Sequence, residues 1–191
     1  LGCAVQSIES RGADSVVHCN EFAIAADLVI NCAGLTAPEL AADLGGAPEA
    51  YYAKGHYYSY AGRQPFSRLV YPVAEAGGLG VHVTLDLAGQ IKFGPDVRWL
   101  SEIDYSFDDS HKEEFATAIR AYFPGLDVSR LQPSYTGIRP KISGPNELAA
   151  DFMLYGPEQH GVAGRLNLLG IESPGLTASL ALAEAVADRI A

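Results

Sequence analysis

Residues 170–181, GIESPGLTASLA, directly follow the apolar run of residues 166–169. The pattern predicts a buried strand that turns at once into a helix, with Ser173 as N-cap and Pro174 at the first helical position. A helix N-terminus presents unpaired N–H groups and a partial positive charge, so this one could stabilise a group that becomes negative. A well-capped structural helix would show the same pattern, and both interpretations stay open at this point.

His82 is the first candidate for acid–base chemistry. It lies in an otherwise apolar stretch, residues 81–85, that is typical of a strand, and side-chain alternation puts Thr84 on the same face. The ordinary histidine pKa of about 6.5 suits proton transfer at neutral pH. A lone histidine in a strand is more often a hydrogen-bonded structural residue. His56 is the competing candidate, and Lys54 would point to the same side of its strand.

Arg139, in the segment Gly-Ile-Arg-Pro of residues 137–140, is the candidate for binding a carboxylate. A guanidinium can donate two parallel hydrogen bonds to a carboxylate, although a lone arginine is more often a surface or structural residue. Lys141 would share its strand face and could help with a second carboxylate. Tyrosines are dense around residues 51–71, as in any half-buried sheet, and Tyr71 is the one that we retain as a substrate contact.

The elements that must position these residues fall into two patterns. Both ends of the chain predict strands and helices in alternation, whereas the middle predicts an antiparallel sheet with one helix. Near the N-terminus, strands are expected at residues 3–9, 16–19, 22–24 and 27–34, the last one buried on both faces. A short helix capped by Thr36 should cover residues 36–44. The closing helix should carry one apolar face, made of Leu176, Leu180, Ala183, Ala187 and Ile190.

In the middle, residues 51–60 predict one long strand, and residues 81–85 and 90–93 predict a hairpin. A helix is expected over residues 108–123, with a capping box of Ser110 and Glu113. Its apolar stripe would be Phe115, Ile119, Tyr122 and Phe123. Further strands are expected at residues 69–73, 131–142, 152–155 and 166–171.

Composition and charge argue against several classes of function. The chain has 191 residues, 48% hydrophobic and 19% charged, with a net charge of −10 that argues against non-specific binding to nucleic acid or anionic membranes. No stretch approaches the roughly 20 apolar residues of a membrane span. Cys3, Cys19 and Cys32 have no metal-ligand spacing and are expected as buried small side chains in a reducing compartment. There is no nucleophile elbow, phosphate loop or zinc signature, and no metal is expected.

Seven segments together resemble a known family. DLVINCAGL, residues 27–35, is similar to the strand that closes the FAD-binding domain in the D-amino-acid-oxidase-like flavoprotein superfamily. Six more follow in the order found in the branch that oxidises L-2-hydroxyglutarate. They are KGHYY (54–58), YPV (71–73), GVHVT (80–84), GPD (94–96), GIR (137–139) and SPGLTASL (173–180). The resemblance runs from about Cys3 to the C-terminus.

The resemblance implies FAD as a cofactor. Cys32, Ala33 and Gly34 would lie beside its adenosine end, and Gly55 would let a loop approach the flavin closely. The turn at residues 170–177 would lie against the flavin pyrimidine, where reduction deposits negative charge. Its contacting residues would be Gly170, Ile171, Ser173, Pro174, Gly175, Leu176 and Thr177. Some relatives attach flavin through a cysteine near the strand at residues 152–155, but all three cysteines here precede residue 33, which predicts a non-covalent flavin.

For the reaction, the resemblance implies hydride transfer from a 2-hydroxy acid to flavin, with oxygen or a quinone as electron acceptor. His82 or His56 would remove the hydroxyl proton. Substrate contacts would come from Arg139, Lys141, Tyr71 and Lys54. Oxidation of an amino acid or secondary amine on the same scaffold is the alternative, because Arg139 suits both. The branch usually carries Arg-Gly-Glu-Tyr where this chain has KGHY at residues 54–57.

One feature of the family has no counterpart in this sequence. Members open with a strand and G-x-G-x-x-G, which lets a helix N-terminus meet the pyrophosphate, and Gly-Gly-Leu-Gly at residues 77–80 predicts only a tight turn. The chain begins with Leu1, and we expect it to be the C-terminal half of such an enzyme that does not bind FAD tightly by itself. Its use as an isolated binding module is the non-enzyme alternative. A cytoplasmic location, with at most peripheral membrane association, is expected.

The expected fold class is therefore α/β plus α+β. An incomplete Rossmann-like FAD-binding domain would comprise residues 1–47 and 160–191. The antiparallel-sheet substrate domain would be inserted between them, at residues 48–159.

Overall fold

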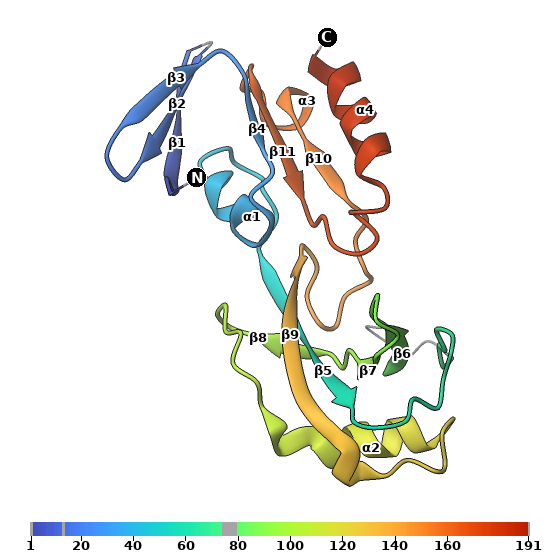
Figure 1. Cartoon of the computed structure of the whole chain (residues 1–191). Helices are drawn as coiled ribbons and strands as arrows, with labels where there is room; N and C mark the ends of the chain where they lie inside the picture. The colour runs from blue at the N-terminus through green and yellow to red at the C-terminus, as the bar shows by residue number, and fades with distance from the viewer. Residues whose placement is uncertain (1, 13, 74–79, 191) are drawn as a thin grey trace. The chain divides into compact units, whose positions relative to one another are not determined.

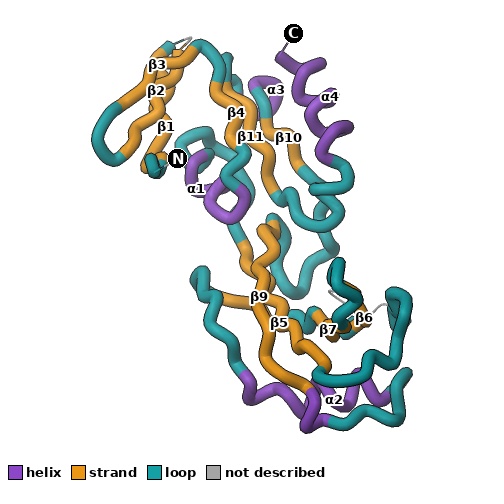
Figure 2. The backbone as a smooth tube through the Cα atoms, in the orientation of Figure 1, coloured by secondary structure: helices purple, strands orange, loops and turns teal. Residues whose placement is uncertain are grey.

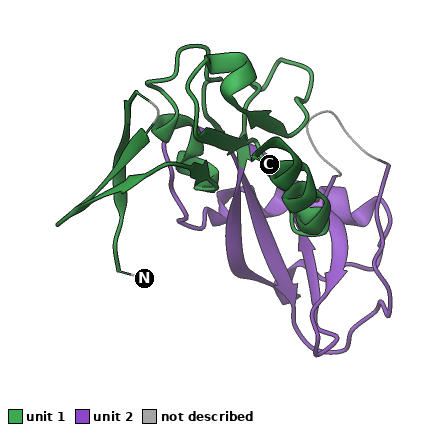
Figure 3. Cartoon of the chain, turned by 90° about the horizontal axis from the view of Figure 1, so that it is seen from above, with its two compact units in different colours: residues 1–51, 140–191 green, residues 52–139 purple. Residues whose placement is uncertain are grey.

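The computed structural model describes residues 2–12, 14–73 and 80–190, and the chain divides into two compact units (Figure 3). Unit 1 contains residues 1–51 and 140–191, and unit 2 contains residues 52–139. The inserted unit is shorter than expected at its C-terminal side. The reason is that β10 (Met153–Tyr155) pairs with β11 (Arg165–Leu169) inside unit 1.

Unit 1 is built on two sheets (Figure 1). The first is antiparallel, in the order β1 (Val5–Arg11), β2 (Asp14–Cys19), β3 (Ala23–Ala26). The second has the order β10-β11-β4, in which β4 (Val29–Asn31) runs parallel to β11. This parallel pair joins segments from opposite ends of the sequence, as the alternating pattern at both ends predicted.

Strand β4 departs from the prediction of a long strand buried on both faces. It has only three residues, and Ile30 is 38% exposed. Within the described part of the chain β4 pairs with β11 alone, so one of its edges has no neighbour. The cysteines differ from the prediction as well: Cys3 and Cys32 are exposed rather than buried, and Cys19 is partly buried.

The first helical segment is also shorter than predicted. A 3-10 turn η1 (Gly34–Thr36) leads into α1 (Ala37–Leu40), which ends long before residue 44. Thr36 does not cap it through its side chain, because its hydroxyl donates to the carbonyl of Ala33 at 3.3 Å. The segment still contributes to the core of unit 1. That buried cluster consists of Ala37, Ala41, Leu44, Tyr155 and Leu169.

The closing helix begins later than its sequence signals suggest. Residues 173–178 form successive turns, and α4 (Ser179–Ile190) starts only after them (Figure 2). The N–H of Gly175 donates to Glu172 O and that of Ala178 to Pro174 O, so these turns close on themselves. The predicted N-cap role of Ser173 is therefore wrong. The predicted apolar face is exposed at Leu176 and Leu180, and Val186 is the residue of α4 that is buried.

Unit 2 is a sheet with the order β6-β7-β5-β8, with β9 paired to β5. The central strand β5 (Tyr51–Tyr60) has the predicted limits, and β9 (Leu131–Lys141) matches its prediction to within one residue. The predicted hairpin is β6 (His82–Leu85) and β7 (Ile91–Gly94). The carboxylate of Asp86 accepts hydrogen bonds from the N–H groups of Ala88 and Gln90 and so closes the hairpin turn.

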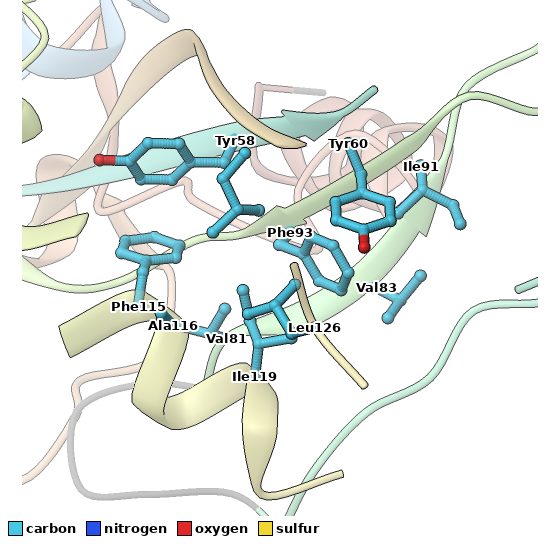
Figure 4. Close-up of a cluster of buried hydrophobic side chains, with 11 residues drawn as sticks. Tyr58, Tyr60, Val81, Val83, Ile91, Phe93, Phe115, Ala116, Ile119 and Leu126 are labelled. Carbon is cyan, nitrogen blue, oxygen red and sulfur yellow. The ribbon is translucent and has the colours of Figure 1, made fainter. Parts of the chain in front are cut away.

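Helix α2 (Lys112–Arg120) covers one face of this sheet, and Figure 4 shows its side chains pointing toward those of the strands. Phe115 and Ile119 are buried as their helical spacing predicted. The start of the helix differs from the predicted capping box. A 3-10 turn η2 (Asp109–His111) precedes α2, and the Asp108 carboxylate caps it by accepting from the N–H of Ser110 at 2.9 Å.

A few shorter elements complete the fold. The strand expected at residues 69–73 is reduced to one bridge between Val70 and Val83. Three elements escaped prediction: β8 (Arg98–Leu100), η3 (Val128–Arg130) and α3 (Pro157–His160). The predicted turn at residues 77–80 lies outside the described residues apart from its last glycine. Throughout residues 2–12, 14–73 and 80–190, we find no helix with the length and apolar character needed to cross a bilayer.

Candidate active site

The two faces of the sheet in unit 2 have different chemistry. Tyr58, Val83 and Phe93 point to the α2 side and are buried in the core. Because side chains alternate, their neighbours on the same strands point the other way. We call this second face the tyrosine face; its described members used below are Tyr57, Tyr71, His82, Thr84, Lys92, Tyr135 and Arg139.

His82 on β6 is held in one orientation. Its Nδ1 lies 3.0 Å from the carbonyl oxygen of Gly80, and because a carbonyl only accepts, Nδ1 carries the proton. The ring stacks on Tyr71, with centroids 4.4 Å apart and planes at 20°. Nε2 has no hydrogen-bond partner among the described residues, so it presents a lone pair.

Burial lowers the pKa of His82 below its ordinary value. The hydrogen bond to Gly80 opposes this shift, and the positive charge of Arg139 adds to it. His82 is therefore neutral at physiological pH, which is the state that a proton acceptor needs.

A glycine on the neighbouring strand makes room beside His82. Gly94 lies directly opposite His82 across β6 and β7. A Cβ atom on Gly94 would lie 2.9 Å from Cδ1 of Tyr57, so the absence of a side chain lets the Tyr57 ring occupy this position. Tyr57 in turn stacks on Tyr135, with ring centroids 4.5 Å apart. His82 and this tyrosine pair are thus neighbours on the tyrosine face.

Arg139 supplies positive charge to this group. Burial raises the pKa of Tyr57 and the Tyr135 hydroxyl raises it further, whereas the guanidinium of Arg139 opposes the rise. The same guanidinium acts on His82. The structure therefore brings three predicted residues, His82, Tyr71 and Arg139, into one group, in which a neutral imidazole that can accept a proton feels the positive charge of a guanidinium.

His56 and Lys54 lie on the opposite face. The His56 side chain is 4% exposed, and its Nδ1 lies 3.0 Å from the carboxylate of Asp96. Its Nε2 is buried without a hydrogen-bond partner in the described structure and packs near Phe107. Lys54 is 3% exposed and pairs with Asp104 at 3.1 Å. The two do share a side, as predicted, but it is the side of α2 and its core.

The packing of unit 2 explains why residue 55 is a glycine. A Cβ at this position would lie 2.4 Å from Cβ of Pro95 and 3.2 Å from the carbonyl oxygen of Asp96. The close approach that Gly55 permits is therefore that of the segment after β7. Its predicted contact with a cofactor stays a prediction.

In unit 1, Lys141 forms an ion pair with Glu172, at the turn that was predicted to face the flavin. Gly170 in this turn has φ +68°, and a Cβ on it would lie 2.9 Å from Ile142. The turn is thus packed against the end of β9. Its outer residues are exposed: Ser173, Pro174, Leu176 and Thr177. Gly175 has no room for a side chain, because its Cβ would lie 2.6 Å from Ile171.

The other predicted cofactor segment of unit 1 lines a groove of about 470 Å³. Cys32 and Ala33 form part of its wall, together with Val5 and Val29. The adjoining Gly34 has φ +62° and open space where a Cβ would stand. Small side chains and an open backbone fit the nucleotide end of a dinucleotide cofactor.

Three residues of the tyrosine face are not among the predicted site residues. Tyr57 belongs to the group of tyrosines interpreted as ordinary sheet residues, and Tyr135 and Lys92 are absent from the predictions. The available signal was alternation: Lys92 lies between Ile91 and Phe93, both fully buried, so it had to point away from the core. Among the described residues, no group of histidine, cysteine and acidic side chains could hold a metal ion.

Comparison with known proteins gives consistent results. A family described as "FAD dependent oxidoreductase" matches residues 1–189. The chain is 49% identical over 180 residues to the mitochondrial L-2-hydroxyglutarate dehydrogenase of Arabidopsis thaliana, covering 85% of this chain and 37% of that protein. It is 22% identical over 231 residues to the L-2-hydroxyglutarate dehydrogenase of Indibacter alkaliphilus, covering 98% of this chain and 56% of the relative. The chain thus spans 37% and 56% of the length of these two relatives.

Solved structures with the same fold include two flavin enzymes. The L-α-glycerophosphate oxidase of Mycoplasma pneumoniae, solved with FAD bound, matches 98% of this chain and 50% of its own, with a TM-score of 0.79 and 22% identity. Glycine oxidase of Geobacillus kaustophilus matches 98% of this chain and 48% of its own, with a TM-score of 0.72 and 19% identity. At these identities the likeness establishes the mixed α/β fold with antiparallel sheets.

Proposed function

Because the chain belongs to the FAD-dependent oxidoreductase family, we propose that it is part of a flavoenzyme that oxidises a 2-hydroxy acid to the 2-oxo acid. The substrate class follows from the 49% identity to a protein named L-2-hydroxyglutarate dehydrogenase. The observation in the chain itself that carries the proposal is His82: a neutral imidazole with a fixed tautomer, beside the guanidinium of Arg139.

Each residue of the group around His82 has its own role in the proposed reaction. Arg139 binds the substrate carboxylate, which fixes the adjacent hydroxyl-bearing carbon. Nε2 of His82 accepts the hydroxyl proton as the C–OH becomes C=O, and the Nδ1–H bond to Gly80 keeps Nε2 in its acceptor form. The stacked ring of Tyr71 limits rotation of the imidazole. His56 is disfavoured as the base because its Nδ1 is occupied by Asp96 and its Nε2 is buried.

Non-covalently bound FAD would supply the acceptor for the hydride that leaves the substrate carbon. In this chain the groove at Cys32 and Ala33 suits its adenosine end, and the exposed turn at residues 173–177 suits its isoalloxazine end. We propose that unit 1 is the incomplete Rossmann-like part of the FAD-binding domain and that unit 2 is the substrate domain. An acceptor such as oxygen or a quinone would complete the turnover.

Anaerobic bleaching of the flavin tests the proposal in the complete FAD-loaded protein. We expect L-2-hydroxyglutarate to bleach it and D-amino acids or glycine not to. His82→Ala should slow bleaching by roughly 10²- to 10⁴-fold, the usual contribution of a general base, while retention of the flavin stays nearly the same. His111→Ala, on the α2 side, is the control.

Two outcomes would overturn parts of the proposal. Equal bleaching rates in His82→Ala and the unchanged protein would reject His82 as the base. Bleaching by amines alone would reject the hydroxy acid as substrate.

A further inference from the structure

Lys92 is a lysine of the tyrosine face, and it has no carboxylate partner among the described residues. Lys54 pairs with Asp104 and Lys141 with Glu172, whereas Lys92 makes no ion pair with any described residue. Its Nζ instead lies 5.0 Å from the ring centroid of Tyr135. The positive charge of Lys92 thus lies over an aromatic ring, and no acid in the part of the chain that the structure describes neutralises it.

The strand register fixes where Lys92 stands relative to His82. Lys92 is directly opposite Thr84, and Gly94 is directly opposite His82, on the same pair of strands. Lys92 is therefore one pleat repeat, roughly 7 Å, along the strand from the row that contains His82. Tyr135 connects the two rows, because its ring lies near Lys92 and stacks on Tyr57.

This spacing gives the face two cations with one proton acceptor nearby. Arg139 acts on His82 and Tyr57, in the first row, and Lys92 occupies the second. A monocarboxylic substrate would use only the first cation. A dicarboxylic one would also pair with the second, which otherwise lies over the Tyr135 ring with no described acid as its partner.

We propose that Lys92 binds the second carboxylate of a dicarboxylic 2-hydroxy acid and so sets the preference for dicarboxylic over monocarboxylic substrates. The inference rests on the proposed function of the same face. It also reassigns the role predicted for Lys141, whose ammonium is engaged by Glu172. Lys92 is a specificity-determining residue, since the reacting carbon lies with His82 and Arg139.

Substrate comparison tests this in the complete FAD-loaded protein. We expect Lys92→Gln to lower kcat/KM for 2-hydroxyglutarate by roughly tenfold or more, as expected for loss of a charge-assisted hydrogen bond. The value for 2-hydroxypentanoate, which has the same carbon chain without the second carboxylate, should stay the same. Lys92→Arg should restore most of the difference. Equal effects on both substrates, or none on either, would overturn the inference.

Lys112→Gln is the matched control. Its Nζ lies over the Tyr58 ring at 5.9 Å, so it is also a lysine held by a tyrosine, but on the α2 side of the sheet. We expect this variant to leave the ratio of kcat/KM values for the two substrates unchanged. An equal change of that ratio in Lys112→Gln would mean that loss of surface charge, rather than a contact, explains the result.

Binding of glutarate separates this inference from the proposed function. Glutarate has two carboxylates and no hydroxyl, so its binding, followed by the change in flavin absorption, does not require oxidation. We expect Lys92→Gln to raise its Kd at least tenfold. If glutarate binding depends on Lys92 and no 2-hydroxy acid bleaches the flavin, Lys92 binds a carboxylate but the proposed reaction fails, and with it the role of Lys92 in choosing among 2-hydroxy acids. If 2-hydroxyglutarate is oxidised and Lys92→Gln leaves the Kd of glutarate unchanged, the reaction stands and the inference fails.

Discussion

At the scale of single residues, the environment decides which of two similar histidines can do chemistry. His82 and His56 both lie in strands and both looked suitable by sequence. Their difference is the face of the sheet: His56 lies on the α2 side beside Asp96, and His82 lies on the other face, stacked on Tyr71. Alternation could predict which residues share a face, but not which face α2 would cover. That choice depends on contacts between residues distant in sequence, such as Tyr58 with Phe115.

The pH dependence of the reaction should report the environment of His82. A base works only when deprotonated, and burial lowers the pKa of His82. We therefore expect the acid limb of kcat/KM to lie below the ordinary histidine value of about 6.5. Tyr71→Ala uncovers the ring, reduces its desolvation and should move the limb upward, toward 6.5.

Tyr71→Phe is the control, because it keeps the stacked ring and should keep the position of the limb. A pH profile of kcat/KM for the three proteins is the measurement. An identical acid limb in Tyr71→Ala would show that the titrating group is not His82 or that Tyr71 does not shield it.

At the scale of elements, short-range patterns predicted the strands of unit 2 well. The alternation of β5 and the hairpin of β6 and β7 depend on neighbouring residues, and their limits agree with the sequence to within one or two positions. The start of α4 did not follow from such signals. Ser173 and Pro174 look like a helix start, yet residues 173–178 make turns closed by Gly175 and Ala178, and Gly170 is packed against Ile142 from β9. Local capping signals cannot include that distant contact.

At Gly94, the hairpin of β6 and β7 packs closely against residues of β5. It has φ +141°, and a Cβ there would lie 2.5 Å from His56 O and 2.9 Å from the Tyr57 ring. Gly94→Ala should therefore cost about 2 kcal/mol or more in the free energy of unfolding of unit 2, from backbone strain and collision together. The single tryptophan, Trp99 on β8, reports unfolding of this unit by fluorescence in urea.

Gly89→Ala provides the comparison within the same hairpin. Gly89 has φ +76° and nothing within 4 Å of its Cβ position, so only the strain of a left-handed backbone applies, about 1 kcal/mol. Similar losses in the two variants would contradict the argument that Tyr57 needs the space over Gly94.

At the scale of the whole molecule, the chain has two hydrophobic cores, one in each unit. The larger is built on β5, β6, β7 and α2, and the smaller on α1, β10 and β11. The sequence indicated a change of pattern in the middle of the chain, but the return to unit 1 at residue 140 could not be read from it. Strand β9 looks continuous through residue 141, and only the pairing of β10 with β11 assigns residues 153–155 to unit 1.

Because each unit has its own hydrophobic core, a destabilising substitution in one core should promote unfolding of that unit alone. Ile119 and Leu169 are both fully buried, in unit 2 and unit 1 respectively. Each change to alanine removes the same kind of apolar volume and should cost roughly 2–5 kcal/mol in the unit that contains it. Hydrogen exchange followed by mass spectrometry should show Ile119→Ala increasing exchange in residues 52–139, and Leu169→Ala increasing it in residues 1–51 and 140–191. Loss of protection throughout both units from either change would mean that they unfold together, because the strands β5 and β9 that pass between them would then transmit the loss.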